Sequence, residues 1–459
     1  MVDVDRLTAD DQIVLLADDR WPQDVGLLAL LDGASLVGDD GQVALDAVRA
    51  WIETRLDAVP RLRQVLSVPT RVLGRPVWVD DAQFDLRHHV RTATVAPPGD
   101  EAQLLATVER LRRCTLDRTR PLWEIWLLAG LPEGRVGLFA RVHHVACDGL
   151  AGVTTFGSLL STAAPTPGRP WEPSPPPTRR ELMTDNLRRT ADLLRRTATP
   201  AVHPARTARR ARDAWPPIHD LFTGEPGPQT SLNRLVGTGR TFALARAELD
   251  LVHRTARAHH STINDVLLTA VAGGVRELLR QRGEPADDLI LPIYVPVSLR
   301  EDRHAEQTGN RLSQIVLPLH LDAAAPGTRL EQIAAETRRR KAMPHPPLGS
   351  IFRGRLLGHA MLRLVAGKRV NLTSADLVGP PTPLSLGKAP LLEMFPLLNL
   401  IGNVTLGVSA ISYRGQLDMM AVGDADTYPD LDVFAFGFRR ELHALTQPVT
   451  AASSGEAAR

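Results

Sequence analysis

Apolar side chains recur at three- and four-residue steps in several stretches of the chain, a spacing that is typical of amphipathic helices. Between residues 41 and 59, for example, Val48, Ile52 and Leu56 fall on one side of such a helix. The same pattern predicts further helices over 101–117, 263–283 and 328–343.

Shorter apolar runs bounded by Gly, Pro and Asp predict strands and turns. Two such runs flank a turn signal at 132–134 and predict a hairpin, and a second turn at 413–415 separates two more runs. Further strands are predicted within 71–90, 288–299 and 310–321. Helices are thus interspersed with strands in both halves of the chain, which predicts the α/β fold class.

Length and proline content indicate how the chain is divided. A length of 459 residues exceeds the usual size of one hydrophobic core, and prolines concentrate between about 162 and 230, which indicates an exposed crossover. We predict an N-terminal domain over 1–161, a Pro- and Arg-rich crossover with a helix over 162–230, a C-terminal domain over 231–449 and a disordered tail over 450–459.

The composition is that of a soluble globular protein, with 43% hydrophobic and 23% charged residues. A net charge of only +2 argues against a dedicated nucleic-acid binder. A membrane span would need about 18 consecutive apolar residues, and the sequence has no such run. The acidic N-terminus lacks the pattern of a secretory signal, and Cys114 and Cys147 are too few for a disulfide framework or a zinc site. A reducing cytoplasm is the expected location.

The crossover contains ten arginines between residues 179 and 213. Leu182, Leu187, Leu193 and Leu194 could supply an apolar stripe along a helix there. Two interpretations remain open: a basic amphipathic helix that lies on an anionic membrane surface, and a solvated linker helix that packs on its own protein.

The stretch RVHHVACDGLAG at 141–152 contains two adjacent histidines at the end of an alternating, half-buried strand. Adjacent strand residues point to opposite faces, so His143 and His144 are expected to have different roles, one in a reaction channel and one buried or structural. Helical spacing begins after Gly149, which places Asp148 in a strand-to-helix loop. Its carboxylate could cap that helix or hold the loop so that one imidazole stays in position.

Histidine, with an ordinary pKa of about 6.5, is suited to take a proton from a hydroxyl near neutral pH. In an acyl transfer it would deprotonate an alcohol as the oxygen attacks a thioester, and no serine nucleophile would be required. A metal site is disfavoured because neighbouring strand histidines diverge. A nucleophilic Cys147 is conceivable, but this small residue is better explained by packing of the loop.

The stretch HHVACDG matches the HHxxxDG motif of the chloramphenicol acetyltransferase-like superfamily, and the chain around it resembles the bacterial wax ester synthase/diacylglycerol acyltransferase family. Segments that resemble this family, in its order, include VPRLRQVL, LDRTRPLWEIWLLAGL, TINDVLLTAVAGGVRELL, PVSLR and TGNRLS, and the resemblance covers about residues 7 to 445. It implies two chloramphenicol acetyltransferase-like domains joined by a crossover, with the active-site channel at their interface.

The resemblance also implies roles for individual residues. It makes His144 the general base, with His143 beside it in the catalytic motif, and it gives Asp148 a structural role in holding the motif loop. The two other adjacent pairs, His88 with His89 and His259 with His260, are expected to be structural. The supporting motif residues are Gly149, Pro121, Leu122, Trp123, Asn264, Asp265, Ser298, Arg300 and Asn310.

The pair Asn264 and Asp265 has two interpretations. Both residues lie in the first turn of a predicted helix whose cap could be Thr262, so Asp265 could simply complement the helix dipole. The resemblance implies that this segment approaches the channel from the other half, where Asn264 would donate to the developing oxyanion or to the acceptor. Ser298, Arg300 and Asn310 are expected to shape the channel and the domain interface.

One segment departs from the family pattern. A run like TNVPGP is frequent in the family, whereas this chain reads SADLVGP and places Asp376 at the asparagine and Val378 at the first proline. An acid in place of an amide loses two hydrogen-bond donors. The departure therefore concerns substrate scope more than the chemistry.

The resemblance implies an O-acyltransferase that moves a long-chain acyl group from acyl-CoA to the hydroxyl of diacylglycerol or of a long-chain alcohol. One alternative is an acyltransferase of the same superfamily with a natural-product or carrier-linked substrate, and another is a catalytically silent protein that binds a lipid surface or a partner. Acyl-CoA is expected as co-substrate, with no further cofactor, no metal and no nucleic acid. Peripheral attachment to the inner membrane or to lipid droplets is expected.

Overall fold

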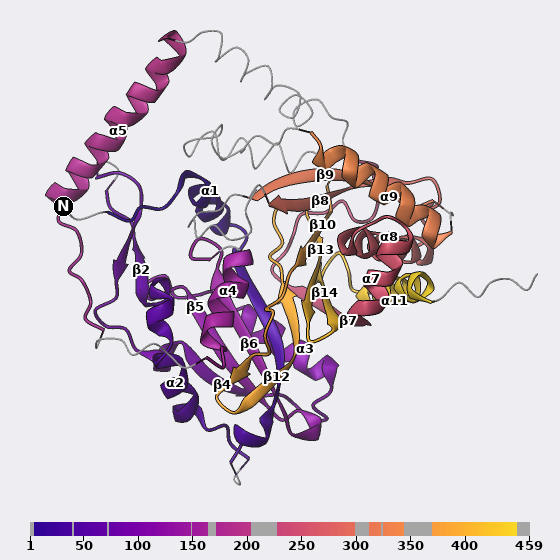
Figure 1. Ribbon diagram of the computed structural model, residues 1–459, viewed down its shortest axis with the longest axis horizontal. Coiled ribbons are helices and arrows are strands. Elements are labelled where there is room, and N and C mark those ends of the chain that lie inside the picture. The colour runs from indigo at the N-terminus through magenta and orange to yellow at the C-terminus, as the bar shows by residue number, and fades with distance from the viewer. Residues whose placement is uncertain are drawn as a thin grey trace, which may run out of the picture.

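The computed structural model describes residues 4–38, 41–70, 73–147, 149–163, 171–202, 227–298, 312–322, 325–343 and 370–447. In this part of the chain, two six-stranded sheets lie next to each other (Figure 1). The first is built mainly from the N-terminal half and the second from the C-terminal half. Helices flank both sheets, which confirms the predicted α/β class.

The first sheet has the strand order β11-β12-β1-β6-β5-β4. Its strands are β1 (Asp24–Asp32), β4 (Val90–Thr94), β5 (Trp123–Ala129), β6 (Arg135–His143), β11 (Ser385–Leu386) and β12 (Ala389–Leu397). Strands β5 and β6 form the hairpin predicted around 132–134, with Ile125 opposite Ala140. The strand that carries the histidines, β6, thus lies inside the sheet between β1 and β5.

Strands β11 and β12 belong to the first sheet although they come late in the sequence. Strand β12 runs antiparallel to β1, with Ala29 opposite Met394. Two strands within the predicted range 231–449 therefore complete the sheet of the N-terminal half. The predicted domain bounds themselves stay a prediction.

Both faces of the first sheet are covered. Helices α2 (Leu45–Glu53) and α4 (Gly149–Leu159) pack on one face, where Ile52 and Ala140 share a core cluster. Helix α3 (Glu101–Arg112) packs on the other face, where Phe139 shares a cluster with Val108 and with Met420 of the second half. The prediction of a half-buried strand was wrong, because α3 and the second half bury the face of β6 that was expected to meet solvent.

Smaller elements complete the N-terminal half. Helix α1 (Ala9–Asp18) precedes β1, and β2 (Gln64–Ser67) pairs with β3 (Val77–Asp80) in a separate two-stranded sheet. Short 3-10 helices span Gly33–Ser35, Leu56–Ala58, Pro60–Arg63, Leu86–His88 and Pro132–Gly134.

The second sheet has the strand order β7-β14-β13-β10-β8-β9. Its strands are β7 (Arg240–Glu248), β8 (Ile290–Ser298), β9 (Leu312–His320), β10 (Leu372–Leu377), β13 (Leu406–Tyr413) and β14 (Gln416–Asp424). The turn predicted at 413–415 joins β13 and β14, which pair antiparallel. The segments predicted as strands in 288–299 and 310–321 form β8 and β9.

Helices α7 (Leu249–Ala258), α8 (Ile263–Gln281), α9 (Pro326–Lys341) and α11 (Leu431–Thr446) accompany the second sheet. The four predicted helices are thus confirmed as α2, α3, α8 and α9. Helices α8 and α11 approach closely at Gly274, where a Cβ atom would lie 2.6 Å from a ring carbon of Phe434. Glycine at this position permits the contact that holds the two helices together.

Within the predicted crossover, helix α5 (Arg179–Val202) projects away from the body of the molecule (Figure 1). Its first turns nevertheless pack on the N-terminal half: Leu182 is buried beside Val4, and Asp185 forms an ion pair with Arg6. The first turns of α5 therefore match the interpretation of a linker helix that packs on its own protein. None of the helices in the described residues is both long and apolar enough to cross a membrane.

A buried acid lies where the two sheets meet. Asp418 on β14 is 1% exposed, and its Oδ2 accepts a hydrogen bond of 2.9 Å from the backbone nitrogen of Met394 on β12. Its Oδ1 has no hydrogen-bond partner among the described residues. Burial raises the pKa of Asp418 to about 7, and the neighbouring Glu393 adds to the shift.

Asp418 should make the protein less stable as the pH rises from about 4 to about 7. Its pKa is higher in the folded than in the unfolded chain, so folding is favoured by the proton at low pH and loses this contribution as pH passes through the folded pKa. We expect Asp418→Asn, which keeps an acceptor for Met394, to remove most of this dependence and to raise stability at pH 8 by roughly 2–4 kcal/mol. Urea unfolding at pH 5 and pH 8 measures the effect, and parallel pH curves for the two proteins would contradict it.

Candidate active site

The backbones of His143 and His144, at the end of strand β6, bond to different neighbouring segments. The backbone nitrogen of His143 donates to the carbonyl oxygen of Leu122 at 2.9 Å, on the side of β5. The backbone nitrogen of His144 donates to the carbonyl oxygen of Gln23 at 2.8 Å, on the side of β1. The backbone nitrogens of these two consecutive residues thus point to opposite neighbours, as expected at the end of an extended strand.

His143 is buried inside the protein. It is 3% exposed, its Nε2 lies 3.0 Å from Oδ2 of Asp18, and its Nδ1 accepts a hydrogen bond of 3.2 Å from the nitrogen of Val145. Because Nδ1 accepts this hydrogen bond, it carries no proton, and the other ring nitrogen is the one that lies beside the carboxylate of Asp18. His143 is therefore held in place by contacts on both sides of its ring, and its role in the motif stays a prediction.

Asp18, the last residue of α1, holds this arrangement together. Its Oδ1 accepts from the nitrogen of Gln23 at 2.8 Å, and its Oδ2 accepts from Arg118. Burial alone would raise the pKa of Asp18, but hydrogen bonds from His143, Gln23 and Arg118 outweigh burial and lower it. Asp18 therefore remains charged, and it fixes the ring of His143.

His144 is the histidine that stays partly accessible. Its residue is half-buried, in contrast to the buried residues 143 and 145 on either side. The backbone hydrogen bond to Gln23 fixes its position, and the core on both faces of β6 restricts the strand behind it. An accessible imidazole on a rigid support suits a group that exchanges protons with a substrate.

The segment Pro121, Leu122 and Trp123 supports the histidines from β5. Leu122 accepts the backbone hydrogen bond from His143, and the indole nitrogen of buried Trp123 donates to the carbonyl oxygen of Leu62 at 2.7 Å. The ring of Trp123 stacks on His89 at 4.7 Å between centroids. These residues contribute to packing around the histidine strand.

The other histidine pairs have structural contacts, as expected. Burial lowers the pKa of His89, and its Nδ1 lies 2.9 Å from the carbonyl oxygen of Trp123. His88 lies 2.8 Å from Arg120, and His259 lies 3.1 Å from Glu331 on α9.

Asp265 caps helix α8. Its Oδ2 accepts from the backbone nitrogen of Thr262 at 2.9 Å, while its own nitrogen donates to the Thr262 hydroxyl at 3.3 Å. This reciprocal capping box satisfies donors at the helix start, so the capping interpretation of Asp265 holds. The neighbouring Asn264 differs: its Nδ2 is buried and has no hydrogen-bond partner within the described ranges. A buried amide donor without a partner calls for an explanation.

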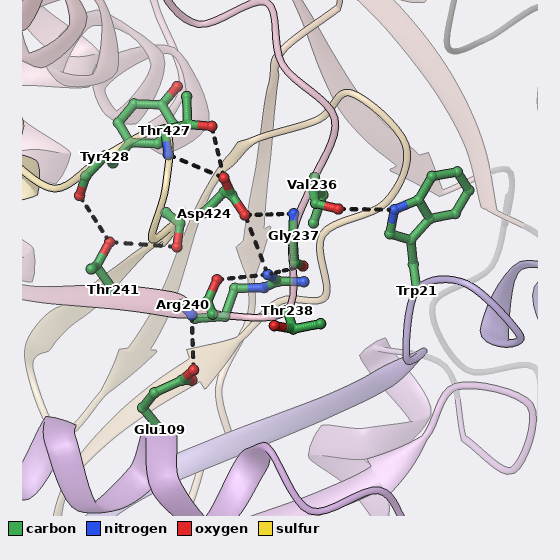
Figure 2. A network of polar contacts seen from close by, with 12 residues as sticks. Trp21, Glu109, Val236, Gly237, Thr238, Arg240, Thr241, Asp424, Thr427 and Tyr428 are labelled. Atoms are coloured by element: carbon green, nitrogen blue, oxygen red, sulfur yellow. Dashed lines mark hydrogen bonds and ion pairs between the residues drawn. The ribbon is translucent and has the colours of Figure 1, made fainter.

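A buried polar network links the two halves (Figure 2). Glu109 on α3 accepts from the backbone nitrogen of Arg240 at 2.9 Å, and the guanidinium of Arg240 lies 3.6 Å from Asp424. Trp21, between α1 and β1, donates from its indole nitrogen to the carbonyl oxygen of Val236 at 3.2 Å. Burial lowers the pKa of Arg240 to about 10. The segment that precedes β1 is therefore attached to the second half.

Comparison with known proteins agrees with this architecture. The model of the wax ester synthase/diacylglycerol acyltransferase catalytic domain matches residues 7–267, and the model of the WS/DGAT C-terminal domain matches residues 308–446. The chain belongs to the wax ester synthase/diacylglycerol acyltransferase family. The resemblance noted in the sequence is thereby confirmed.

Relatives and solved structures agree with this assignment. The chain is 29% identical to a Mycobacterium tuberculosis protein named as a diacylglycerol O-acyltransferase, over 87% of this chain and 82% of that protein. Another M. tuberculosis protein with this activity in its name is 28% identical, over 90% and 89%. The wax ester synthase/diacylglycerol acyltransferase from Marinobacter aquaeolei is 25% identical, with a TM-score of 0.67 over 96% of this chain and 98% of that chain. The starter condensation domain of rhizomide synthetase, 17% identical with a TM-score of 0.61 over 96% and 94%, shows that the fold extends beyond the family.

The structure describes only some of the residues that the family resemblance singled out. Gly149 begins α4, as predicted, and Ser298 is the last residue of β8. Asp148, Arg300 and Asn310 lie outside the described residues, as does the side chain of Ser298. Their predicted roles stay predictions.

The segment that departs from the family pattern begins inside strand β10 and continues past its end. Asp376 is exposed at this strand's end, yet desolvation by the surrounding protein raises its pKa to about 6, against the effect of Lys341. Val378 is 72% exposed. Gly379 approaches the backbone so closely that a Cβ atom would lie 1.8 Å from the carbonyl oxygen of Ser412. The glycine of the family pattern is thus required by packing.

The surroundings of Cys147 give no support to a thiol mechanism. Cys147 is buried in the core, and its sulfur lies 3.4 Å from the hydroxyl of Thr155. Burial among apolar side chains disfavours a reactive thiolate. Within the described ranges, no group of three His, Cys, Asp or Glu side chains is arranged to hold a metal ion.

Sequence reasoning missed Asp18, Gln23 and Asn399. Asp18 contacts His143 across 125 positions of sequence, and Asn399 contacts Gln23 across 376 positions. Neither contact has a local sequence pattern. Only the acidic end of the first helix, directly before a strand, could have drawn attention to Asp18.

Proposed function

We propose that the protein is an O-acyltransferase that moves a long-chain acyl group from acyl-CoA to the hydroxyl of diacylglycerol or a long-chain alcohol, with His144 as general base. The products are triacylglycerol or wax ester and free coenzyme A. The observation that carries the proposal is the half-buried His144 directly after a buried strand, within a chain that matches both domains of the family. Both M. tuberculosis relatives and the M. aquaeolei protein carry this activity in their names.

The proposed reaction proceeds in a ternary complex. His144 takes the hydroxyl proton as the alcohol oxygen bonds to the thioester carbon, which gives a tetrahedral oxyanion. The oxyanion collapses, the carbon–sulfur bond breaks, and the coenzyme A thiolate takes the proton from the imidazolium. The buried Nδ2 of Asn264 is suited to donate to the oxyanion, because it has no hydrogen-bond partner in the described part of the chain. His143 and Asp18 keep the strand end rigid.

An assay of purified protein with radiolabelled palmitoyl-CoA tests the proposal. Diacylglycerol, hexadecanol and no acceptor are compared in parallel. Neutral lipid that appears only with an acceptor supports the activity, and the faster acceptor identifies the main product. Absence of product with every lipid acceptor, from folded protein, would contradict it.

That negative result would favour a second candidate, acyl transfer to a specialised natural-product or carrier-linked substrate. The observation in favour of it is the SADLVGP segment, where Asp376 replaces an amide of the family pattern and has a pKa of about 6.

We also propose that the protein works in the cytoplasm, attached peripherally to the inner membrane or to lipid droplets. Helix α5 supports this location. Met183 and Leu187 are 47% and 63% exposed on the side of α5 that faces away from Leu182 and Asp185. Arg180 is exposed on the same side, and Arg188 is exposed on the flank of the helix. Arginines around exposed apolar side chains fit an anionic lipid surface.

The double variant Arg180→Glu/Arg188→Glu should lose affinity for vesicles that contain anionic phosphatidylglycerol. Each arginine near such a surface contributes about 1 kcal/mol, so reversal of two charges should weaken binding more than tenfold. Flotation with vesicles measures the bound fraction. The variant Arg87→Glu/Arg135→Glu changes net charge equally at exposed sites elsewhere and serves as control. Equal flotation of all three proteins would rule out α5 as the attachment site.

A further inference from the structure

Gln23 occupies a buried position between α1 and β1 and is 3% exposed. Its backbone and its side chain make four hydrogen bonds. The backbone nitrogen donates to Asp18 Oδ1 at 2.8 Å, Nε2 donates to the carbonyl oxygen of Trp21 at 2.7 Å, Oε1 accepts from Asn399 Nδ2 at 2.7 Å, and the carbonyl oxygen accepts from the nitrogen of His144 at 2.8 Å. Gln23 therefore contacts both Asp18, which lies against the ring of His143, and the backbone of His144.

Asn399 brings the second half of the protein to this point. It lies between β12, which belongs to the first sheet, and β13, which belongs to the second. Its side-chain amide donates to the side-chain oxygen Oε1 of Gln23. Two residues earlier in the chain, the indole nitrogen of Trp21 donates to the carbonyl oxygen of Val236 (Figure 2). The short segment 21–23 is thus held by the second half at two places and by His144 at a third.

We propose that Gln23 and Asn399 form a positioning pair through which the docking of the two halves sets the place of His144. The inference rests on the proposed role of His144 as base. Without the amide of Asn399, the side-chain oxygen Oε1 of Gln23 loses its donor, and a buried acceptor without a partner is unfavourable. Gln23 then shifts, and the backbone of His144 shifts with it. A displacement of about 1 Å at a catalytic group can lower the rate about 100-fold.

The variant Asn399→Ala should therefore lower kcat by about 10- to 100-fold, while KM for palmitoyl-CoA changes less than about twofold, since the substrate contacts remain. Gln23→Ala should have a similar effect. The double variant should be no slower than the worse single variant, because both changes break the same bond. Asn399→Asp, which keeps the volume and loses the donor, repeats the test should the alanine variant fold poorly.

Arg246→Ala is the matched control. Arg246 on β7 also joins the two halves, through ion pairs of 3.0 Å to Glu101 and 2.9 Å to Glu393. Among the described residues, its side chain forms no hydrogen bond or ion pair with residues 140–147. It should lower the thermal midpoint and leave kcat within about twofold. Hydrogen exchange of the peptide around residues 140–147 gives a readout independent of activity: the amide of His144 should exchange faster in Asn399→Ala and not in Arg246→Ala.

The outcomes separate the inference from the proposed function. If Asn399→Ala retains kcat while His144→Ala is inactive, the base stands and the positioning pair is refuted. Additive losses in the double variant would also refute it. If His144→Ala is as active as wild type, the proposed function of the histidine fails, and faster exchange of the His144 amide would then show only a structural link.

Discussion

The His144→Ala variant should transfer acyl groups about 10²- to 10⁴-fold more slowly than wild type, the range that general-base catalysis contributes. His144 comes directly after strand β6, which is covered on both faces, and is itself half-buried. The substitution therefore removes the proposed base without removing a side chain of the core. KM for palmitoyl-CoA should change little, because the base acts in the transition state. Single-turnover and steady-state rates with the preferred acceptor measure the loss.

The matched control for His144 is Cys147→Ser. It changes a buried side chain three positions away, and serine keeps a hydroxyl in reach of Thr155. Its kcat should stay within about twofold of wild type if Cys147 only packs the loop. A folded His144→Ala protein with wild-type kcat would require another base, and an inactive Cys147→Ser would revive the thiol mechanism.

The Asp424→Ala variant should lose about 3–5 kcal/mol of stability, the largest effect expected away from His144. The side chains of Asp424 and Arg240 are 1% and 3% exposed, and the carboxylate also accepts from Gly237 and Thr427. Its removal leaves the Arg240 guanidinium buried without its nearest carboxylate. Urea unfolding followed by tryptophan fluorescence measures the change.

Asp287→Ala provides the comparison for this loss. Asp287 pairs with Arg276 and Arg280 on the surface of the second half, where solvent screens the charges. Its unfolding midpoint should match wild type. Equal losses for Asp424→Ala and Asp287→Ala would show that burial does not set the strength of the Arg240 pair.

The sequence was sufficient to predict elements whose signals are local. The apolar spacing of 263–283 predicts α8 because a helix uses contacts three and four residues apart. The turn at 132–134 predicts the hairpin of β5 and β6 for the same reason. The alternation of His143 and His144 follows from strand geometry alone. These predictions needed no knowledge of distant residues.

Contacts between distant residues could not be predicted. The pairing of Ala29 with Met394 depends on how the second half docks, and so does the burial of the second face of β6. Because that docking supplies the cover, alternation along β6 suggested a solvent face that does not exist. The contacts of Asp18 with His143 and of Asn399 with Gln23 could not be predicted from the sequence for the same reason.

The late arrival of β12 in the first sheet bears on how the protein is synthesised. Domains emerge from the ribosome N-terminus first, so β1 and β6 are present long before residues 389–397 are made. Until then, β1 has one unpaired edge, and such edges recruit strands of other chains. A stop codon between residues 144 and 388 therefore leaves a fragment with an open sheet edge, which a cell has to shield with chaperones or degrade.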